Sequence, residues 1–168
     1  PSGGGGCYDL MGNQIVPTYV IGTQYIVNKG FLNPGSNESI FVVATQNFTS
    51  FSINDGNTIT NAFINQGETY QYSITDSLTF LSADKPVYLI HMSGVGCELG
   101  QAILPPINCA GSDQVSFSRA TTRAFYLNLL CPNGAQGNFV LNGSTALIDS
   151  TLFDTVPGTS ALDWRMKL

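Results

Sequence analysis

The stretch Thr49-Ser50-Phe51-Ser52-Ile53, followed by Asn54-Asp55-Gly56-Asn57 and by residues 58–64, decides the fold class. Apolar and polar side chains alternate through 49–53, which is the period of a strand with one buried face. Asp-Gly supplies the positive φ angles that tight hairpin turns require, so residues 58–64 are predicted to return as an antiparallel strand. The D-x-N spacing in the turn also suggests a calcium loop, but the further oxygen ligands and the distal Glu of an EF-hand are missing.

The same pattern recurs along the chain. Short apolar runs rich in Val, Ile, Phe, Tyr and Thr are separated by Gly, Asn, Asp and Pro, and this predicts an all-β fold, an antiparallel β-sandwich. The further strands are expected at 25–27, 40–45, 69–74, 78–81, 87–92, 115–117, 124–130, 138–141 and 146–148. Asn142-Gly143 is a second hairpin signal. Residues 94–111, with Pro105-Pro106 inside, are expected to form a long loop.

The two ends of the chain set the expected domain organisation. Residues 1–6, Pro-Ser followed by four glycines, read as a flexible linker, and residues 7–168 as one module of a longer protein. Alternation resumes at 163–168, so the C-terminal end of the sandwich would be completed by more of the chain or by a partner strand. Pro86 is expected at the first residue of strand 87–92, because proline cannot donate to a strand ladder.

Composition excludes two classes of partner. Only 10% of the residues are charged and the net charge is −5, which excludes nucleic acid because phosphate binding requires clustered Lys and Arg. No apolar run reaches the 18 or so residues of a membrane helix, so membrane insertion is not expected. Low charge and four cysteines together indicate an extracellular or cell-surface protein.

The cysteines are Cys7, Cys97, Cys109 and Cys131. They contain no C-x-x-C pair, so zinc-ligand spacing is absent and no metal or cofactor is expected. Four cysteines allow three disulfide connectivities. We predict Cys97–Cys109, because these residues flank the 94–111 segment, and Cys7–Cys131 as the remaining pair. Free thiols are the open alternative, since no secretory segment is visible.

His91 is the single histidine of the chain. On a strand it shares a face with Val87 and Leu89, and catalysis would require a nucleophile, an orienting carboxylate or further metal ligands. Glu98 lies seven residues away across two glycines. We therefore interpret His91 as structural and expect no catalytic residue. The competing hypothesis is a cysteine- or metal-dependent hydrolase in which Cys97 works with His91.

Tyr70 and Tyr72 alternate with polar residues on one predicted strand, and Ile74 continues their face. Packing in the core is the simpler interpretation of such an alternation. The functional alternative is a stacking surface for sugars, which would make the chain a carbohydrate-binding module attached to a secreted enzyme.

Five motifs in order resemble the N-terminal domain family named after the IgG Fc-binding protein. The matching segments are Gly22-Thr23-Gln24-Tyr25-Ile26-Val27, Val42-Val43-Ala44-Thr45-Gln46-Asn47-Phe48-Thr49, Ser82-Ala83-Asp84-Lys85-Pro86-Val87, Ala102-Ile103-Leu104-Pro105-Pro106-Ile107, and the closing region Tyr126-Leu127-Asn128, Gly134-Ala135 and Leu141-Asn142-Gly143. The resemblance spans roughly Gly12 to Gly158 and is nearest to modules of large bacterial surface proteins.

The resemblance implies secretion and a non-catalytic role in adhesion. Its expected partners are a protein or glycan ligand on another surface and neighbouring modules of the same chain. It supplies no catalytic residue, and the antibody binding in the family's name does not transfer by itself, because a shared fold does not fix a partner.

Overall fold

The computed structural model describes residues 12–32, 38–96, 98–118, 127–159 and 162–165. Every described element is a β-strand or a short 3-10 turn, and no α-helix occurs among these residues, which confirms the predicted all-β class. The chain divides into two compact units, residues 1–111 and 112–168, and each is described by itself.

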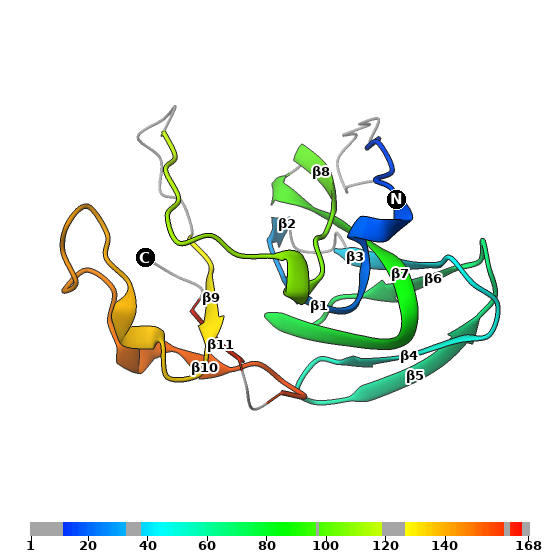
Figure 1. The fold of residues 1–168 in the computed structure, drawn as a ribbon. Helices are drawn as coiled ribbons and strands as arrows, with labels where there is room; N and C mark the ends of the chain where they lie inside the picture. The colour runs from blue at the N-terminus through cyan, green and yellow to red at the C-terminus, as the bar shows by residue number, and fades with distance from the viewer. Residues whose placement is uncertain (1–11, 33–37, 97, 119–126, 160–161, 166–168) are drawn as a thin grey trace. The chain divides into compact units, whose positions relative to one another are not determined.

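The first unit is organised around one long strand, β7 (Leu78–Gly96), which bends strongly along its length (Figure 1). Its first half pairs with β1 (Gly22–Asn28) on one edge and β4 (Thr49–Asn54) on the other. Its second half pairs with β8 (Glu98–Ile103) and β3 (Ser39–Ala44). The sheet then continues from β4 to β5 (Ile59–Ile64) and from β3 to β6 (Thr69–Ser73). All these pairs are antiparallel, and the short β2 (Phe31–Leu32) adds a parallel pair at the end of β7.

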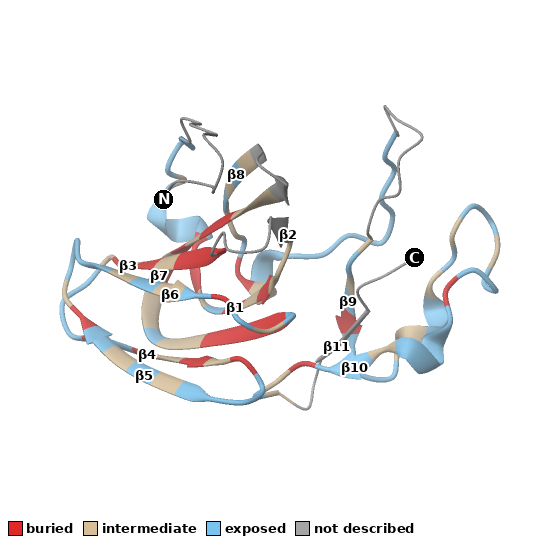
Figure 2. Cartoon of the chain, turned by 180° about the vertical axis from the view of Figure 1, so that it is seen from behind, coloured by how far each residue is buried: buried red, intermediate tan, exposed pale blue. Residues whose placement is uncertain are grey.

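The bend in β7 turns the two halves of the sheet into two layers that share a core. One buried cluster takes Ile53 and Leu81 from the first half and Val42 and Leu89 from the second. Figure 2 shows this burial concentrated on β1, β3 and β7, whereas β5 is largely exposed. The first unit therefore has the antiparallel two-layer packing expected from the alternating pattern.

Pro86 lies inside β7 and not at the start of a strand, so that prediction was wrong. The two predicted strands 78–81 and 87–92 are one strand. The register leaves Asp84, Lys85 and Pro86 without a partner on either edge, since β4 pairing ends at Ala83 and β3 pairing begins at Val87. A residue without an N–H is tolerated at this position because no ladder hydrogen bond is required there.

The expected loop 94–111 is also corrected. β7 continues to Gly96 and β8 returns along it from Glu98 to Ile103, so most of this segment is an antiparallel hairpin. Gly94, Gly96 and Gly100 concealed the strands, because glycine carries no side chain that could reveal a period of two. A 3-10 turn, η2 (Ile107–Cys109), follows β8.

The hairpin at the opening stretch is confirmed. β4 and β5 pair in regular register from Thr49↔Ile64 to Asn54↔Ile59. The turn between them contains Gly56 at φ 93°, and the backbone N–H of Asp55 donates to the carbonyl of Thr58 (3.2 Å). Predicted strands at 25–27, 40–45 and 69–74 are likewise confirmed as β1, β3 and β6.

The second unit holds a small antiparallel sheet in the order β10 (Asp154–Thr155), β11 (Leu162–Arg165), β9 (Leu129–Pro132). The predicted final strand is confirmed for residues 163–165 in β11, and residues 166–168 lie outside the described residues. Of the predicted strand 124–130, residues 129–130 are confirmed in β9, residues 127–128 are not in a strand, and residues 124–126 lie outside the described residues. The predicted strands 115–117, 138–141 and 146–148 are wrong. In their place the described chain forms irregular structure, an isolated bridge Leu141↔Ser144 around the Asn142-Gly143 turn, and 3-10 turns η3 (Gln136–Asn138) and η4 (Ser150–Leu152). In the first unit, a further 3-10 turn, η1 (Thr18–Val20), precedes β1.

Candidate functional site

The family-like motifs at residues 42–49 and 82–87 contact each other. The turn between β3 and β4, residues 45–48, lies against the unpaired residues of β7. Lys85 Nζ donates to the carbonyl oxygens of Asn47 (2.6 Å) and Phe48 (2.7 Å). Thr45 Oγ1 donates to the carbonyl of Pro86 (2.7 Å). The side chains of Lys85 and Thr45 therefore hold the turn against β7.

The turn is also held from its other side by the β5–β6 connection. The backbone N–H of Gln66 donates to Asn47 Oδ1 (3.2 Å), and the backbone N–H of Phe48 donates to Asn65 Oδ1 (3.4 Å). Thr49 Oγ1 closes the turn on the carbonyl of Gln46 (2.8 Å). These bonds fix the backbone that carries Phe48.

Phe48 has a backbone φ of 57°, in the left-handed region that residues with a Cβ seldom adopt. Such a conformation costs about 1–2 kcal/mol for a residue other than glycine or asparagine. Phe48 is 68% exposed and Phe63 is 53% exposed, and the centroids of their rings lie 5.9 Å apart. A strained residue that holds an apolar ring in solvent is typical of a functional site.

A shallow, open depression lies beside this ring pair, on the outer face of β4 and β5. Ser50, Phe51, Ser52, Asn61, Ala62 and Phe63 line it. The register places Ser50 opposite Phe63 and Ser52 opposite Asn61, so these four share the outer face. We call Phe48, Ser50, Ser52, Asn61 and Phe63 the hairpin face.

The predicted ligand candidates Tyr70 and Tyr72 lie on the inner side of β6, partly buried and packed against the core. The Tyr70 ring meets Phe51 edge to face at 5.3 Å. Tyr72 Oη donates to Asp55 Oδ2 (2.7 Å). Both tyrosines are thus used in packing the two layers, and a role for either in ligand binding stays a prediction.

Asp55 links the β4–β5 turn to the opposite layer. Its carboxyl accepts from the backbone N–H groups of Asn57 (2.9 Å) and Thr58 (2.7 Å), as well as from Tyr72. Burial alone would raise the pKa of Asp55, but these hydrogen bonds outweigh it and lower the pKa to about 2. A carboxylate so fully satisfied is a structural anchor.

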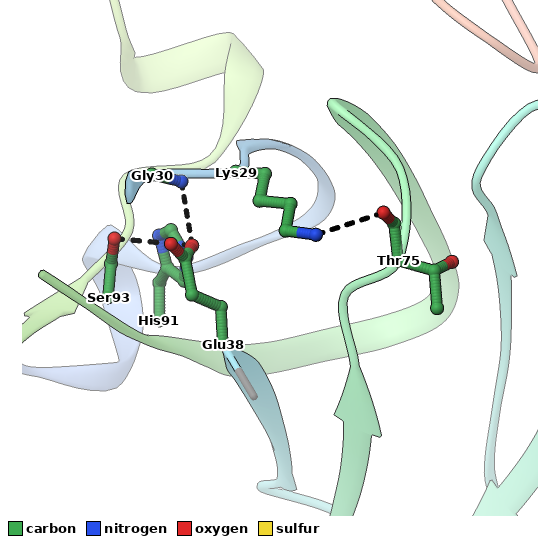
Figure 3. Close-up of polar contacts among 6 residues, drawn as sticks. All are labelled: Lys29, Gly30, Glu38, Thr75, His91 and Ser93. Atoms are coloured by element: carbon green, nitrogen blue, oxygen red, sulfur yellow. Dashed lines mark hydrogen bonds and ion pairs between the residues drawn. The ribbon is translucent and has the colours of Figure 1, made fainter. Parts of the chain in front are cut away.

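His91 has the carboxylate partner that the sequence did not reveal. Its Nε2 lies 3.3 Å from Glu38 Oε2, and Glu38 is only 1% exposed (Figure 3). The same oxygen accepts from the backbone N–H of Gly30 (2.7 Å) and from Ser93 Oγ (3.3 Å). A Cβ at Gly30 would lie 2.3 Å from Ser93 Oγ and 3.0 Å from Glu38 Oε1, so a larger residue would displace the Ser93 hydroxyl from this cluster.

Glu, His and Ser meet in this cluster, but not in the order that nucleophilic catalysis uses. Both Ser93 and His91 direct their polar atoms to Glu38, so the hydroxyl is bonded to the carboxyl and not to the imidazole. Burial lowers the pKa of His91, and the neighbouring Glu38 opposes that shift. These contacts tie the residue before β3, Glu38, to Gly30 after β1 and to His91 and Ser93 of β7. The side chain of Glu98 lies outside the described side chains.

The described cysteines are Cys109, exposed in η2, and Cys131, buried in β9. Their predicted partners Cys97 and Cys7 lie outside the described residues, so both disulfides stay predictions.

The described residues contain neither a cluster of metal-ligating side chains nor a membrane-spanning helix. No group of three or more His, Cys, Asp or Glu side chains that could hold a metal ion occurs among them. None of the described helices is long and apolar enough to cross a membrane.

The fold and these surfaces define an all-β module whose exposed features suit binding. The chain belongs to the family described as IgGFc binding protein, which matches residues 1–168, the whole sequence. This confirms the resemblance drawn from the five motifs. No curated protein and no solved structure matches the chain significantly.

Proposed function

We propose that this chain is a non-catalytic binding module of a larger extracellular or cell-surface protein of the adhesin type. Its family is named for binding a protein, which supports a binding role. The observation that carries the proposal is the exposed Phe48 ring, held at a φ of 57° by hydrogen bonds from Lys85 to the turn that bears it. A strained, exposed aromatic side chain lies outside the core, so it is suited to a contact with another molecule.

The Glu38–His91 cluster supports the non-catalytic part of the proposal. The imidazole and the hydroxyl of Ser93 both contact the carboxyl group, and the cluster is buried, with His91 9% exposed. A substrate would need access to a hydroxyl activated by the imidazole. The geometry offers neither, so we assign these residues to stability.

The expected setting follows from the composition and the sheet. A chain with 10% charged residues and a net charge of −5 suits an extracellular protein that contacts neither nucleic acid nor a membrane interior. Its partners would be a protein or glycan on another surface and the neighbouring modules of its own chain. β5 and β6 end the sheet order of the first unit and would be the places for a partner strand.

We further propose that residues 7–168 act as one module behind the Gly-rich linker 1–6. The family match spans both compact units, which supports treating them together. The two disulfides, Cys97–Cys109 and Cys7–Cys131, are tested by mass spectrometry of a non-reduced digest. A Cys7–Cys97 cross-link or free thiols at Cys97 and Cys109 would contradict this pairing.

The binding role is tested by surface plasmon resonance of the full chain against immobilised IgG Fc, mucin and matrix glycoproteins. We expect binding to at least one of these surfaces, and its loss in Phe48→Asn, which removes the ring from a backbone conformation that Asn adopts readily. The control is Ile59→Ala, which removes another exposed apolar side chain of β5, 64% exposed.

Two results would contradict the proposal. One is the absence of binding to every immobilised surface and to every saccharide used below. The other is a hydrolytic activity that disappears in His91→Ala, because that would make the buried cluster catalytic.

A further inference from the structure

We propose that the hairpin face binds a neutral saccharide. The inference rests on the proposed binding function and names the class of ligand. The face presents the two exposed rings of Phe48 and Phe63 beside the hydroxyl and amide groups of Ser50, Ser52 and Asn61. A sugar ring has the matching chemistry, with a face of C–H groups and an edge of hydroxyl groups.

The polar groups of the depression are available to a ligand. Within the described part of the chain, the side chains of Ser50, Ser52 and Asn61 make no hydrogen bond. The backbone N–H of Ser50 donates to Asp84 Oδ1 (2.9 Å), which fixes β4 to β7 while the hydroxyl stays unengaged. This differs from Tyr72, whose hydroxyl is already bonded to Asp55.

The spacing of these groups suits a ring-sized ligand. Ser50 faces Phe63 across the ladder and Ser52 faces Asn61, and cross-strand neighbours on one face have Cβ atoms about 4.5–5.5 Å apart. Successive pairs along the strands are separated by two residues, about 6.6 Å. One sugar ring on Phe63 would thus place its neighbour over Ser52 and Asn61.

Charge selects a neutral ligand over an anionic or cationic one. The six lining residues include no charged side chain. Two charged residues of β7 bond to segments beside it: Lys85 donates to two backbone carbonyls, and Asp84 accepts from the backbone N–H of Ser50. A phosphate or carboxylate ligand would therefore meet no counter-charge in the depression.

A saccharide fits these observations better than a protein epitope. Protein hot spots centre on an apolar, desolvated core with a polar rim. Here the lining is mixed, because Ser50 lies opposite the exposed Phe63 and Ser52 lies opposite Asn61 across the ladder. The turn that carries Phe48 is fixed by Lys85 before any ligand arrives, which reduces the entropy lost on binding.

Affinity electrophoresis of the full chain tests the inference, with native gels that contain galactomannan, xyloglucan, mannan or dextran as neutral probes and polygalacturonate as an anionic one. We expect retardation by at least one neutral probe, with an affinity weakened about tenfold or more in Phe63→Ala and in Asn61→Ala. Ile59→Ala, on the same strand and outside the depression, should leave the retardation unchanged.

The failures of the two proposals are distinguishable. No retardation by any neutral probe, or retardation that Phe63→Ala and Asn61→Ala leave intact, overturns the saccharide site. Binding to a glycoprotein surface that survives enzymatic removal of its glycans, and that Phe63→Ala abolishes, also overturns it but leaves the binding function standing. Circular dichroism of each variant checks that the strands are retained.

Discussion

The buried Glu38–His91 cluster and the exposed hairpin face are both polar regions of the first unit, but they differ in how their groups are used. In the cluster, one carboxyl oxygen of Glu38 accepts hydrogen bonds from the Gly30 N–H and the Ser93 hydroxyl and contacts the His91 imidazole. On the hairpin face, the serine and asparagine side chains have no partner within the described residues. The comparison teaches that Glu, His and Ser can meet without the hydroxyl-to-imidazole contact that nucleophilic catalysis uses, while the side chains left unbonded are Ser and Asn on a partly exposed hairpin.

The largest effect expected from this difference is that of Glu38→Ala. The substitution removes the acceptor of the part-buried Gly30 N–H and Ser93 hydroxyl and the partner of the buried His91 imidazole, and the free energy of unfolding should fall by about 3 kcal/mol. Urea denaturation measures the change. Glu68→Ala is the matched control, because that carboxyl makes one exposed bond to the N–H of Asn65 (2.7 Å) and should cost about 1 kcal/mol or less. Equal losses would show that the cluster is no more structural than a surface turn.

A smaller effect is expected at Asp55. Its pKa of about 2 in the folded chain lies below the ordinary value near 3.9, so its contribution is present above pH 4 and is lost as pH falls to about 2. Tyr72→Phe removes one of the bonds that lower this pKa and should cost about 1 kcal/mol at neutral pH.

The dependence of the free energy of unfolding on pH between 4 and 2, the acid limb, distinguishes a role of the Tyr72–Asp55 hydrogen bond from simple packing of the tyrosine ring. Tyr72→Phe should lose less stability than the original chain between pH 4 and 2. Tyr70→Phe is the control, because the Tyr70 hydroxyl makes no hydrogen bond within the described residues. A similar acid limb in both variants would contradict the role of Tyr72.

Phe48→Asn should change stability in the opposite direction. Asn adopts the left-handed region more readily than Phe, so the free energy of unfolding should stay constant or rise by up to about 1 kcal/mol. Thermal melting measures it. Phe63→Asn is the control, because it removes the other ring of the pair from a strand without relieving any backbone strain, and it should lower the melting temperature. A marked loss in Phe48→Asn would show that this ring contributes to folding.

The smallest effect is expected from His91, because burial and Glu38 shift its pKa in opposite directions. Burial prevails and the pKa is lowered. The unfolded chain therefore takes up a proton at higher pH than the folded one, and stability falls as pH drops below about 6.5. His91→Gln should remove this slope between pH 6.5 and 5. Stability that instead rises on acidification would mean that the protonated His91 is favoured by Glu38.

The sequence predicted the strands that alternate clearly, because a period of two and an Asp-Gly turn are local signals. It failed at β7 and β8, where an unpaired proline and three glycines interrupt the pattern inside strands. The sequence did not identify Glu38 as the partner of His91, because the two residues are 53 positions apart in the chain and only the folded sheet brings them together. Phe48 lies within one of the family-like motifs, but its positive φ could not be predicted, because phenylalanine seldom adopts that conformation.

The central claim, that recognition occurs on the hairpin face and not at the buried cluster, is tested most directly by NMR titration of the amide signals with an oligosaccharide cut from the retarding neutral polysaccharide. The account predicts shifts confined to the β4–β5 outer face and the turn, with the largest at Phe48, Ser52 and Asn61. Shifts centred on Gly30, Glu38 and His91, with the hairpin face unmoved, would contradict it.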